Sequence, residues 1–299
     1  MRPTLLHLAT IALLFAEALP LAHPEDPSYA KSIAQWRQNY EAGLKADNGW
    51  LTVSGLFWLH EGENRFGSDP ADEIVLPAGS VPAQAGSFIY RNRKVTVQIK
   101  SGVPVTLNGK PVQSAELLPD SQSDQLHLGD LTLYVHASGE RLAIRLRDKN
   151  SALRKQFTGL HWFPVNESYR LQARWTPYNP PKPAQIENIL GDFDRGEILG
   201  YASFPLGGHE YRLEATQDEP GKLFFVFRDL TSGKETYPAA RFLDTDMPRD
   251  GALVLDFNQA YNPPCAYNPY TTCPLPSPQN RLRVEIPAGE KIYNREHAR

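Results

Sequence analysis

The sequence lacks an excess of charge of either sign. Its 31 Lys and Arg residues stand against 34 Asp and Glu residues, a formal net charge of −3 over 299 residues. Proteins that bind nucleic acids usually carry a strongly basic composition or a basic patch. We therefore expect no nucleic-acid partner.

Long hydrophobic runs are also missing. The main apolar stretch, Leu5–Ala16, is shorter than the roughly 20 residues that a membrane-spanning helix needs. It follows the basic Arg2 and precedes the small residue Ala18, an order typical of a secretory signal. We expect residues 1–22 to be a signal peptide, the protein to be secreted or periplasmic, and no membrane attachment once the signal is removed.

Cysteine is scarce, since Cys265 and Cys273 are the only two in the chain. Two thiols close together in a Pro-rich loop predict a disulfide in an oxidising compartment. Zinc is the alternative, but a structural zinc site takes four Cys or His ligands, and no His lies between the two cysteines. We expect the disulfide and no metal site.

Several common catalytic motifs are absent as well. The sequence contains no G-x-S-x-G, H-E-x-x-H, G-x-x-x-x-G-K-[ST] or G-x-G-x-x-G pattern. These patterns hold a nucleophilic serine, a catalytic zinc, nucleotide phosphates and a dinucleotide, respectively. We expect no cofactor, and the eight scattered histidines receive no catalytic role.

Proline is abundant, with 26 residues spread along the chain. Because proline is poorly tolerated inside helices, this content disfavours a helical bundle. One helix is expected within residues 23–48, where Asp26-Pro27 forms a helix start and Ile33, Trp36 and Tyr40 recur at helical spacing.

The segment Gly49–Asp148 consists of short runs of β-type composition separated by turn residues, which predicts a β-sandwich or barrel within residues 49–162. Asn108-Gly109 is typical of a type I′ hairpin turn. Strand alternation places three arginines on an outer face that we interpret as solvated or salt-bridged rather than anion-binding. They are Arg141, Arg145 and Arg147.

A second β-domain is expected over residues 163–299. Its first part, Trp175–Pro183, contains four prolines in nine residues, which predicts an extended connector and not a central strand. Further strands are expected beyond it, the last at Leu253–Phe257. The predicted fold is therefore mainly β, with an N-terminal helix, a sandwich and a second β-domain that ends in a Pro-rich disulfide loop.

The first β-domain resembles a forkhead-associated (FHA) domain. The resemblance rests on Phe66-Gly67, on the strand Asp72–Pro77 and on the hairpin Leu107–Val112. It implies the FHA-like sandwich fold but not the activity, because the family's phosphate-binding arginine and its Ser-x-x-His are replaced. The residues at those positions are Ser68, Pro82 and Ala85.

The region after Leu253 has the densest polar chemistry. Alternation along the strand places Asp256 and Asn258 opposite Leu255, toward a pocket shared with Arg241 and the loop that follows. Rigid tyrosines and asparagines in such a loop can form a binding surface. The alternative is that the loop plugs the domain and that its polar side chains cap turns. The candidate ligand-binding residues are Asp256, Asn258, Tyr261, Asn262, Tyr267 and Asn280.

The same region carries a second and longer resemblance. The motif Asp256-Phe-Asn-x-Ala-Tyr-Asn-Pro-Pro-Cys265, followed by Thr272-Cys-Pro-Leu-Pro276 and Asn280-Arg281-Leu282, is similar to the uncharacterised domain-of-unknown-function family 1684. The resemblance extends from about Trp36 to Tyr293 and implies no activity. It leaves a redox or ligand role open for Cys265 and Cys273.

Two functions compete at this stage. The first is a binding module for a small polar molecule, a glycan or a peptide at the C-terminal site. The second is a hydrolase-like enzyme that uses Asp256 and Glu290 as a carboxylate pair and Arg241 to stabilise charge. The oligomeric state is left open.

Overall fold

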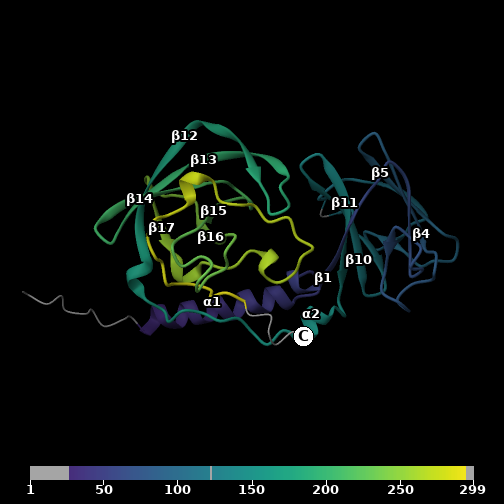
Figure 1. The fold of residues 1–299 in the computed structure, drawn as a ribbon, viewed down its shortest axis with the longest axis horizontal. Coiled ribbons are helices and arrows are strands. Elements are labelled where there is room, and N and C mark those ends of the chain that lie inside the picture. Colours follow the sequence, from purple (N-terminus) through teal and green to yellow (C-terminus); the bar gives the residue numbers. More distant parts are fainter. Residues whose placement is uncertain (1–26, 122, 294–299) are drawn as a thin grey trace, which may run out of the picture.

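The computed structural model describes residues 27–121 and 123–293, so the predicted signal peptide lies outside the described residues. The fold is mainly β, as predicted, with one long helix at the N-terminus. In Figure 1 a sandwich of strands lies on one side, a second β-domain lies on the other, and the helix runs along the edge of the second domain.

The helix α1, Pro27–Lys45, is amphipathic. Ile33 and Leu44 are buried, and the rings of Trp36 and Tyr40 stack at 5.5 Å. Both rings also meet Trp162 edge-on. The apolar stripe of the helix therefore packs against the protein, and no helix among the described residues is long and apolar enough to cross a membrane.

The N-terminal β-domain is a sandwich of two sheets. One sheet has the strand order β1-β11-β10-β9-β6-β7 and the other has the order β3-β2-β4-β5-β8. Neighbouring strands are antiparallel except for β2 and β3. The bounds are β1 Val53–Trp58, β2 Gly62–Gly67, β3 Ile74–Val75, β4 Gly86–Arg91, β5 Lys94–Ile99, β6 Thr106–Leu107, β7 Lys110–Pro111, β8 Ser114–Leu117, β9 Leu126–Leu128, β10 Leu131–Ser138 and β11 Arg141–Asp148.

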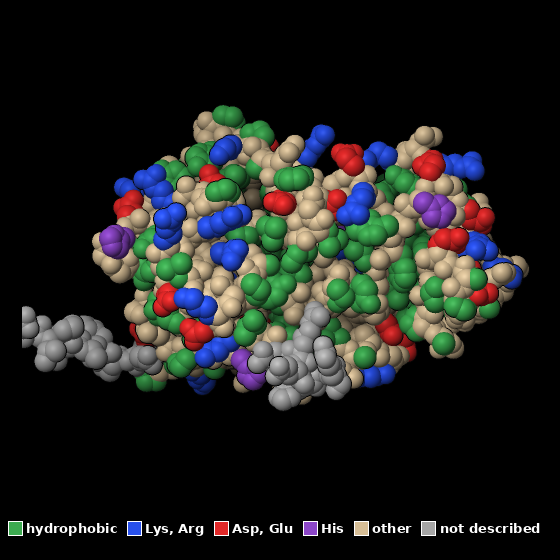
Figure 2. Space-filling view, viewed as in Figure 1, with side chains coloured by type: hydrophobic (Ala, Val, Ile, Leu, Met, Phe, Trp, Pro, Cys, Tyr) green, Lys and Arg blue, Asp and Glu red, His purple; other side chains and the backbone are tan. Residues whose placement is uncertain are grey.

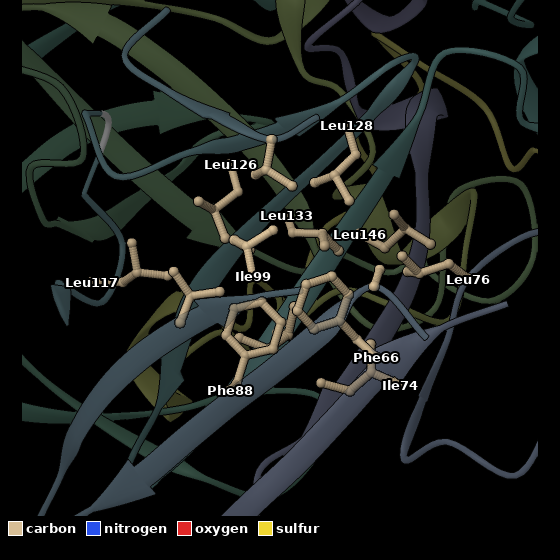
Figure 3. Close-up of a cluster of buried hydrophobic side chains, with 14 of the residues drawn as sticks. Phe66, Ile74, Leu76, Phe88, Ile99, Leu117, Leu126, Leu128, Leu133 and Leu146 are labelled. Atoms are coloured by element: carbon tan, nitrogen blue, oxygen red, sulfur yellow. The ribbon is translucent and has the colours of Figure 1, made fainter. Parts of the chain in front are cut away.

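The space between the two sheets is filled by aliphatic and aromatic side chains, as Figure 3 shows. Phe66 and Phe88 from one sheet are fully buried with Leu133 from the other. The predicted hairpin turn is confirmed, since Asn108 and Gly109 have positive φ angles of 52° and 72° between β6 and β7.

The expectation for the arginines of β11 is wrong for Arg145. Arg141 is exposed, but Arg145 is 4% exposed and its guanidinium lies 5.9 Å from the centre of the Trp50 ring. Arg145 also donates to Thr272 Oγ1 of the second domain at 3.4 Å. This face of the sheet is covered by other parts of the chain, which alternation within one strand cannot reveal.

The C-terminal β-domain contains a sheet of order β14-β13-β12-β17 and a two-stranded sheet, β15-β16. A bridge between Thr216 and Phe224 joins β15 to the end of β14, so the six strands follow one another around a common core. The short helix α2, Ala152–Gln156, precedes this domain, and several 3₁₀ turns cap it. The bounds are β12 Arg170–Glu187, β13 Phe193–Leu206, β14 His209–Ala215, β15 Lys222–Phe227, β16 Arg241–Asp246 and β17 Ala252–Asp256.

The prediction of a connector at Trp175–Pro183 is wrong, because these residues belong to β12. The prolines are tolerated because the register with β13 shifts between Pro177 and Lys182. On its other side β12 pairs with β17 only over Arg170–Arg174. The proline-rich part thus has a single strand neighbour and a bulge, which are the conditions under which a strand accommodates proline.

The far end of the β12–β13 hairpin joins the two domains. Asp192 accepts hydrogen bonds from Ser138 Oγ at 2.7 Å and from Arg141 at 2.5 Å. A second contact links His136 Nε2 and Thr272 Oγ1 at 2.8 Å. The C-terminal segment, yellow in Figure 1, reaches this junction, and Figure 2 shows hydrophobic side chains gathered in the middle of the face.

Candidate functional site

The wall of the C-terminal domain opens where β16 and β17 separate. These strands are consecutive in the chain but belong to different sheets. At one end, Arg249 in the turn after β16 forms backbone hydrogen bonds with Ala252 of β17. At the other end, Phe242 of β16 bonds to Tyr261 in the segment after β17, which closes the opening. We call the space between them the β16–β17 groove; its volume is about 470 Å³.

Backbone groups of both strands face this groove. Phe242 directs its N–H and C=O away from β15, toward Tyr261. Because strand backbones alternate, the N–H and C=O of Asp244 point the same way. Ala252 directs its groups toward Arg249, so those of Val254 likewise face β16. The groove is therefore bordered by two strand edges that carry donors and acceptors.

Charged side chains of both signs surround the groove. None of the six forms a salt bridge within the part of the chain that the structure describes. They are Arg170, Lys222, Asp244, Asp246, Arg249 and Asp256.

Two tyrosines orient two of these carboxylates. The hydroxyl of Tyr29, on α1, donates to Asp256 Oδ1 at 2.8 Å, and the hydroxyl of Tyr261 donates to Asp244 Oδ2 at 2.6 Å. Burial raises the pKa of Asp244, although the Tyr261 hydrogen bond and the charge of Lys222 oppose the rise. Burial and the adjacent Asp256 raise the pKa of Tyr29 well above its ordinary value, so this hydroxyl keeps its proton.

Glu290 lies in a different and closed cluster. It is 1% exposed, and its carboxylate accepts hydrogen bonds from the Asn262 backbone N–H at 2.8 Å, from Asn262 Nδ2 at 2.7 Å and from the Tyr267 hydroxyl at 2.8 Å. Burial raises its pKa to about 7, although these hydrogen bonds and the charge of Arg241 oppose the rise. The carboxylate is thus enclosed by protein donors.

Arg241 is also enclosed. Its side chain is 1% exposed, pairs with Asp229 and donates to the backbone carbonyls of Ile286 and Ala288. Burial lowers the pKa of the guanidinium, and the charge of Asp229 opposes this effect. The arginine ties the C-terminal segment to β16 and does not line the groove.

The expected common pocket does not form. Asp256 lines the β16–β17 groove but is 8% exposed, and Asn258 is fully buried, where its amide donates to Tyr29 and to the Asn166 carbonyl. Strand alternation fails after Asp256 because the chain enters a 3₁₀ turn, Phe257–Gln259, which Asp256 caps. Leu255 and Phe257 are buried, as expected.

The other predicted ligand-binding residues lie in three separate parts of the domain. Tyr261 borders the groove through Asp244, whereas Asn262 and Tyr267 hold Glu290. Asn280 bonds both backbone groups of Glu214 and the carbonyl of Val226, so it acts as a bridge between β14 and β15.

Cys265 and Cys273 are near each other but not bonded. The Cys265 backbone N–H donates to Cys273 Sγ at 3.2 Å. A hydrogen bond with Cys273 and burial raise the pKa of the Cys265 thiol. The pKa of the Cys273 thiol is lowered: burial raises it, but hydrogen bonds with Cys265 and Thr271 outweigh burial. The disulfide remains a prediction, and no group of His, Cys, Asp and Glu suited to a metal occurs among residues 27–121 and 123–293.

No sequence motif pointed to the β16 side of the groove. Asp244 and Asp246 were not singled out because Arg241–Asp246 was not predicted as a strand. The usable signal is the alternation of Leu243 and Thr245 with these two acids, which places both carboxylates on one face.

Comparison with known proteins gives a family. Residues 155–291 match the family described as "Protein of unknown function (DUF1684)". An uncharacterized protein of Haloarcula marismortui, solved by NMR, is 34% identical, with 46% of this chain and 78% of that chain covered and a TM-score of 0.39. None of the curated proteins matches the chain.

FHA domains are among the similar solved structures. One comes from a study of phosphothreonine-dependent FHA domain interactions; it is 20% identical, with 31% of this chain and 92% of that chain covered and a TM-score of 0.23. The FhaA FHA domain, solved with the intracellular domain of Rv3910, is 20% identical, with 31% and 97% covered and a TM-score of 0.23. The DUF1684 match covers residues 155–291, a segment that includes every strand of the C-terminal β-domain.

Proposed function

We propose that the protein binds a small polar molecule carrying both a positive and a negative group, and that the β16–β17 groove is the binding site. The observation that carries the proposal is the set of six charged side chains that surround the groove without pairing with one another. Three are carboxylates and three are cations, so both ends of a zwitterion can find partners.

The size and construction of the groove support a small ligand. Its volume of about 470 Å³ falls in the usual range for small-molecule sites of about 300–1,000 Å³. The Asp244 and Asp256 carboxylates are already held by tyrosine hydroxyls, so binding loses little side-chain entropy there. The free strand edges add donors and acceptors for a polar group.

The hydrolase hypothesis gains nothing from the contacts. A carboxylate pair acts on one substrate only if both groups reach it. Asp256 borders the groove, whereas Glu290 is surrounded by Asn262 and Tyr267. We therefore propose binding as the function of this domain.

A thermal-shift screen of the mature chain tests the proposal. The panel contains free amino acids, dipeptides, diamines, dicarboxylates and neutral sugars. At 100 times its dissociation constant, a bound zwitterion stabilises the protein by about 2.7 kcal/mol, a rise in Tm of several degrees. Asp244→Asn and Lys222→Gln should each reduce that rise, because each removes one charge from the groove.

Lys110→Gln, an exposed change in the sandwich, is the matched control and should leave the thermal shift unchanged. A panel in which only neutral sugars raise Tm would contradict the proposal. So would a zwitterion-induced shift that both groove variants retain in full.

We also propose that the chain is exported and that Cys265 and Cys273 form a disulfide after export. The support is the N-terminal pattern Arg2, Leu5–Ala16 and Ala18, together with the closeness of the cysteines. Protein recovered outside the cytoplasm should begin near Leu19 or His23 and show no free thiol after denaturation. Two titratable thiols would refute the disulfide, and a metal released by a chelator would favour the zinc alternative.

A further inference from the structure

We infer that a second groove, on the opposite strands of the C-terminal domain, docks an extended peptide that carries a basic side chain next to an apolar one. We call it the proline groove. Its walls are the far half of the β12–β13 hairpin, the ends of β14 and β15, and the segment Pro274–Arg281; its volume is about 540 Å³. It shares no lining residue with the β16–β17 groove, so either site can exist without the other.

A free strand edge borders this groove. β13 pairs with β14 only over Gly200–Leu206, so its first half, Phe193–Ile198, is paired on one side only, with β12. The N–H of Ile189 and the C=O of Glu187 point to the opposite side of the hairpin, toward Cys273 and Leu275. By alternation, the backbone groups of Phe193, Arg195 and Glu197 point away from β12. Gly139 of the sandwich lies close to those of Phe193, so the open part of the edge is formed by Arg195 and Glu197.

An exposed strand edge is a template for one more strand. Among the described residues no backbone hydrogen bond occupies this edge. An extended peptide can therefore add to β13 through main-chain hydrogen bonds. Main-chain hydrogen bonds do not depend on the peptide's sequence, so only the side chains that face the groove determine which peptides bind.

Apolar side chains form part of the floor and of the rim of the proline groove. Phe224 and Val226 lie on the outer side of β15, and Ile186 and Ile198 come from the hairpin. The side chain of Phe193 at the rim is 52% exposed. Exposed aromatic residues beside an apolar groove are typical of protein-binding surfaces.

The opposite wall is rigid. Prolines at 274, 276 and 278 restrict its backbone. It is fixed to β12 by the hydrogen bond from Leu275 N–H to the Glu187 carbonyl at 2.7 Å and by that from Ile189 N–H to the Cys273 carbonyl at 2.9 Å. A preformed wall lowers the entropy lost when a partner binds.

The charge of the lining selects a basic partner. Five carboxylates line the groove against two arginines, Arg195 and Arg281, which gives a difference of −3. Asp194 already accepts the N–H of Gly139, and Glu214 accepts the Tyr178 hydroxyl. The other three have no ion-pair partner among the described residues; they are Glu187, Glu197 and Asp218. Phosphate groups are repelled by such a lining, whereas lysine or arginine is attracted.

Selection of a phage-displayed random heptapeptide library on the full mature chain tests the inference. We expect enrichment of peptides in which Lys or Arg lies within two positions of Leu, Ile or Phe. A synthetic copy of the most enriched peptide should bind, and the charge reversals Glu187→Lys and Glu197→Lys should each weaken its binding by tenfold or more. Glu210→Lys, an exposed change on β14 outside the groove, is the matched control and should leave binding unchanged.

Two further results decide the mode of binding. Methylation of alternate backbone nitrogens of the peptide should abolish binding, because these groups pair with the β13 edge. Phe193→Ser should weaken binding while leaving Tm unchanged, since this side chain is largely exposed. A library that yields no basic–apolar consensus would overturn the inference, and so would a consensus peptide that binds all charge-reversal variants equally well.

Discussion

The two β-domains differ in where their charged side chains lie. The sandwich has an apolar core between its sheets, and charged residues such as Arg93 with Glu140 and Lys94 with Glu116 pair near its surface. Its buried Arg145 lies outside that core, against the second domain. The C-terminal domain buries charged groups such as Arg241 and Glu290. Most of these buried groups have protein partners, so burial of polar residues does not identify a site by itself. The groove between β16 and β17 differs because none of its six charged side chains forms a salt bridge among the described residues.

The largest change in stability is expected when the buried ion pair between Arg241 and Asp229 is disrupted. Arg241→Met leaves the buried Asp229 carboxylate without its cation, which should lower the free energy of unfolding by about 3–5 kcal/mol in urea denaturation. The double variant Arg241→Met/Asp229→Asn should recover part of this loss, because the unpaired charge is gone. Arg212→Met, an exposed control, should change stability by less than about 0.5 kcal/mol.

The second prediction concerns Glu290 and pH. Its pKa is raised by burial from 4.5 to about 7, so the folded protein binds a proton that the unfolded chain releases in this interval. The contribution of this group to stability should therefore be complete below about pH 4.5 and fall by about 3 kcal/mol as the pH rises through 7. Urea denaturation from pH 4.5 to 8 should show this slope in the wild type relative to Glu290→Gln. Parallel curves for the two proteins would contradict it.

Replacement of Asn280 should also lower the free energy of unfolding, but by less. Its amide serves both backbone groups of Glu214 and the Val226 carbonyl. Asn280→Ala should lower the free energy of unfolding by about 1–3 kcal/mol, since three backbone groups lose their partner. Ligand-induced thermal shifts at the β16–β17 groove should be unaffected. A loss of those shifts with stability unchanged would instead make Asn280 a binding residue.

The smallest effect is expected in the sandwich. Ser68 donates its hydroxyl to the Val81 carbonyl at 3.0 Å, and Pro82 and Ala85 offer no side-chain donor. Phosphothreonine peptides should therefore bind the protein no better than their unphosphorylated forms in fluorescence anisotropy. A preference above tenfold, about 1.4 kcal/mol, would show that this domain has a phosphate site.

The sequence was sufficient for the features of the fold that depend on local patterns. The α1 helix, the Asn108-Gly109 hairpin and the mainly β architecture follow from periodicity and turn chemistry. The strand through Trp175–Pro183 was missed because prolines are tolerated where a strand has one neighbour, and the number of neighbours is a property of the tertiary fold. Arg145 was placed at the surface for a similar reason, since a distant segment covers its face.

The candidate site was predicted only in part. Asp256 was identified and lines the groove, and Tyr261 was identified and bonds to the groove residue Asp244. The motif that contains them also holds Asn258, Asn262 and Tyr267, whose partners are internal. The residues of a motif are neighbours in the chain, whereas the residues that line a groove are neighbours only in the folded protein. The cations Lys222 and Arg249 come from other segments and could be found only once β16 and β17 were seen to separate.

The most direct test compares Asp256→Asn with Glu290→Gln in the same zwitterion thermal-shift assay. Asp256→Asn should abolish the shift while the free energy of unfolding changes by about 1 kcal/mol, because the asparagine still caps the turn at Asn258. Glu290→Gln should keep the shift and lower stability at pH 6. Retention of the shift by Asp256→Asn, together with its loss in Glu290→Gln, would contradict the assignment of the open groove as the site and of the closed cluster as structural.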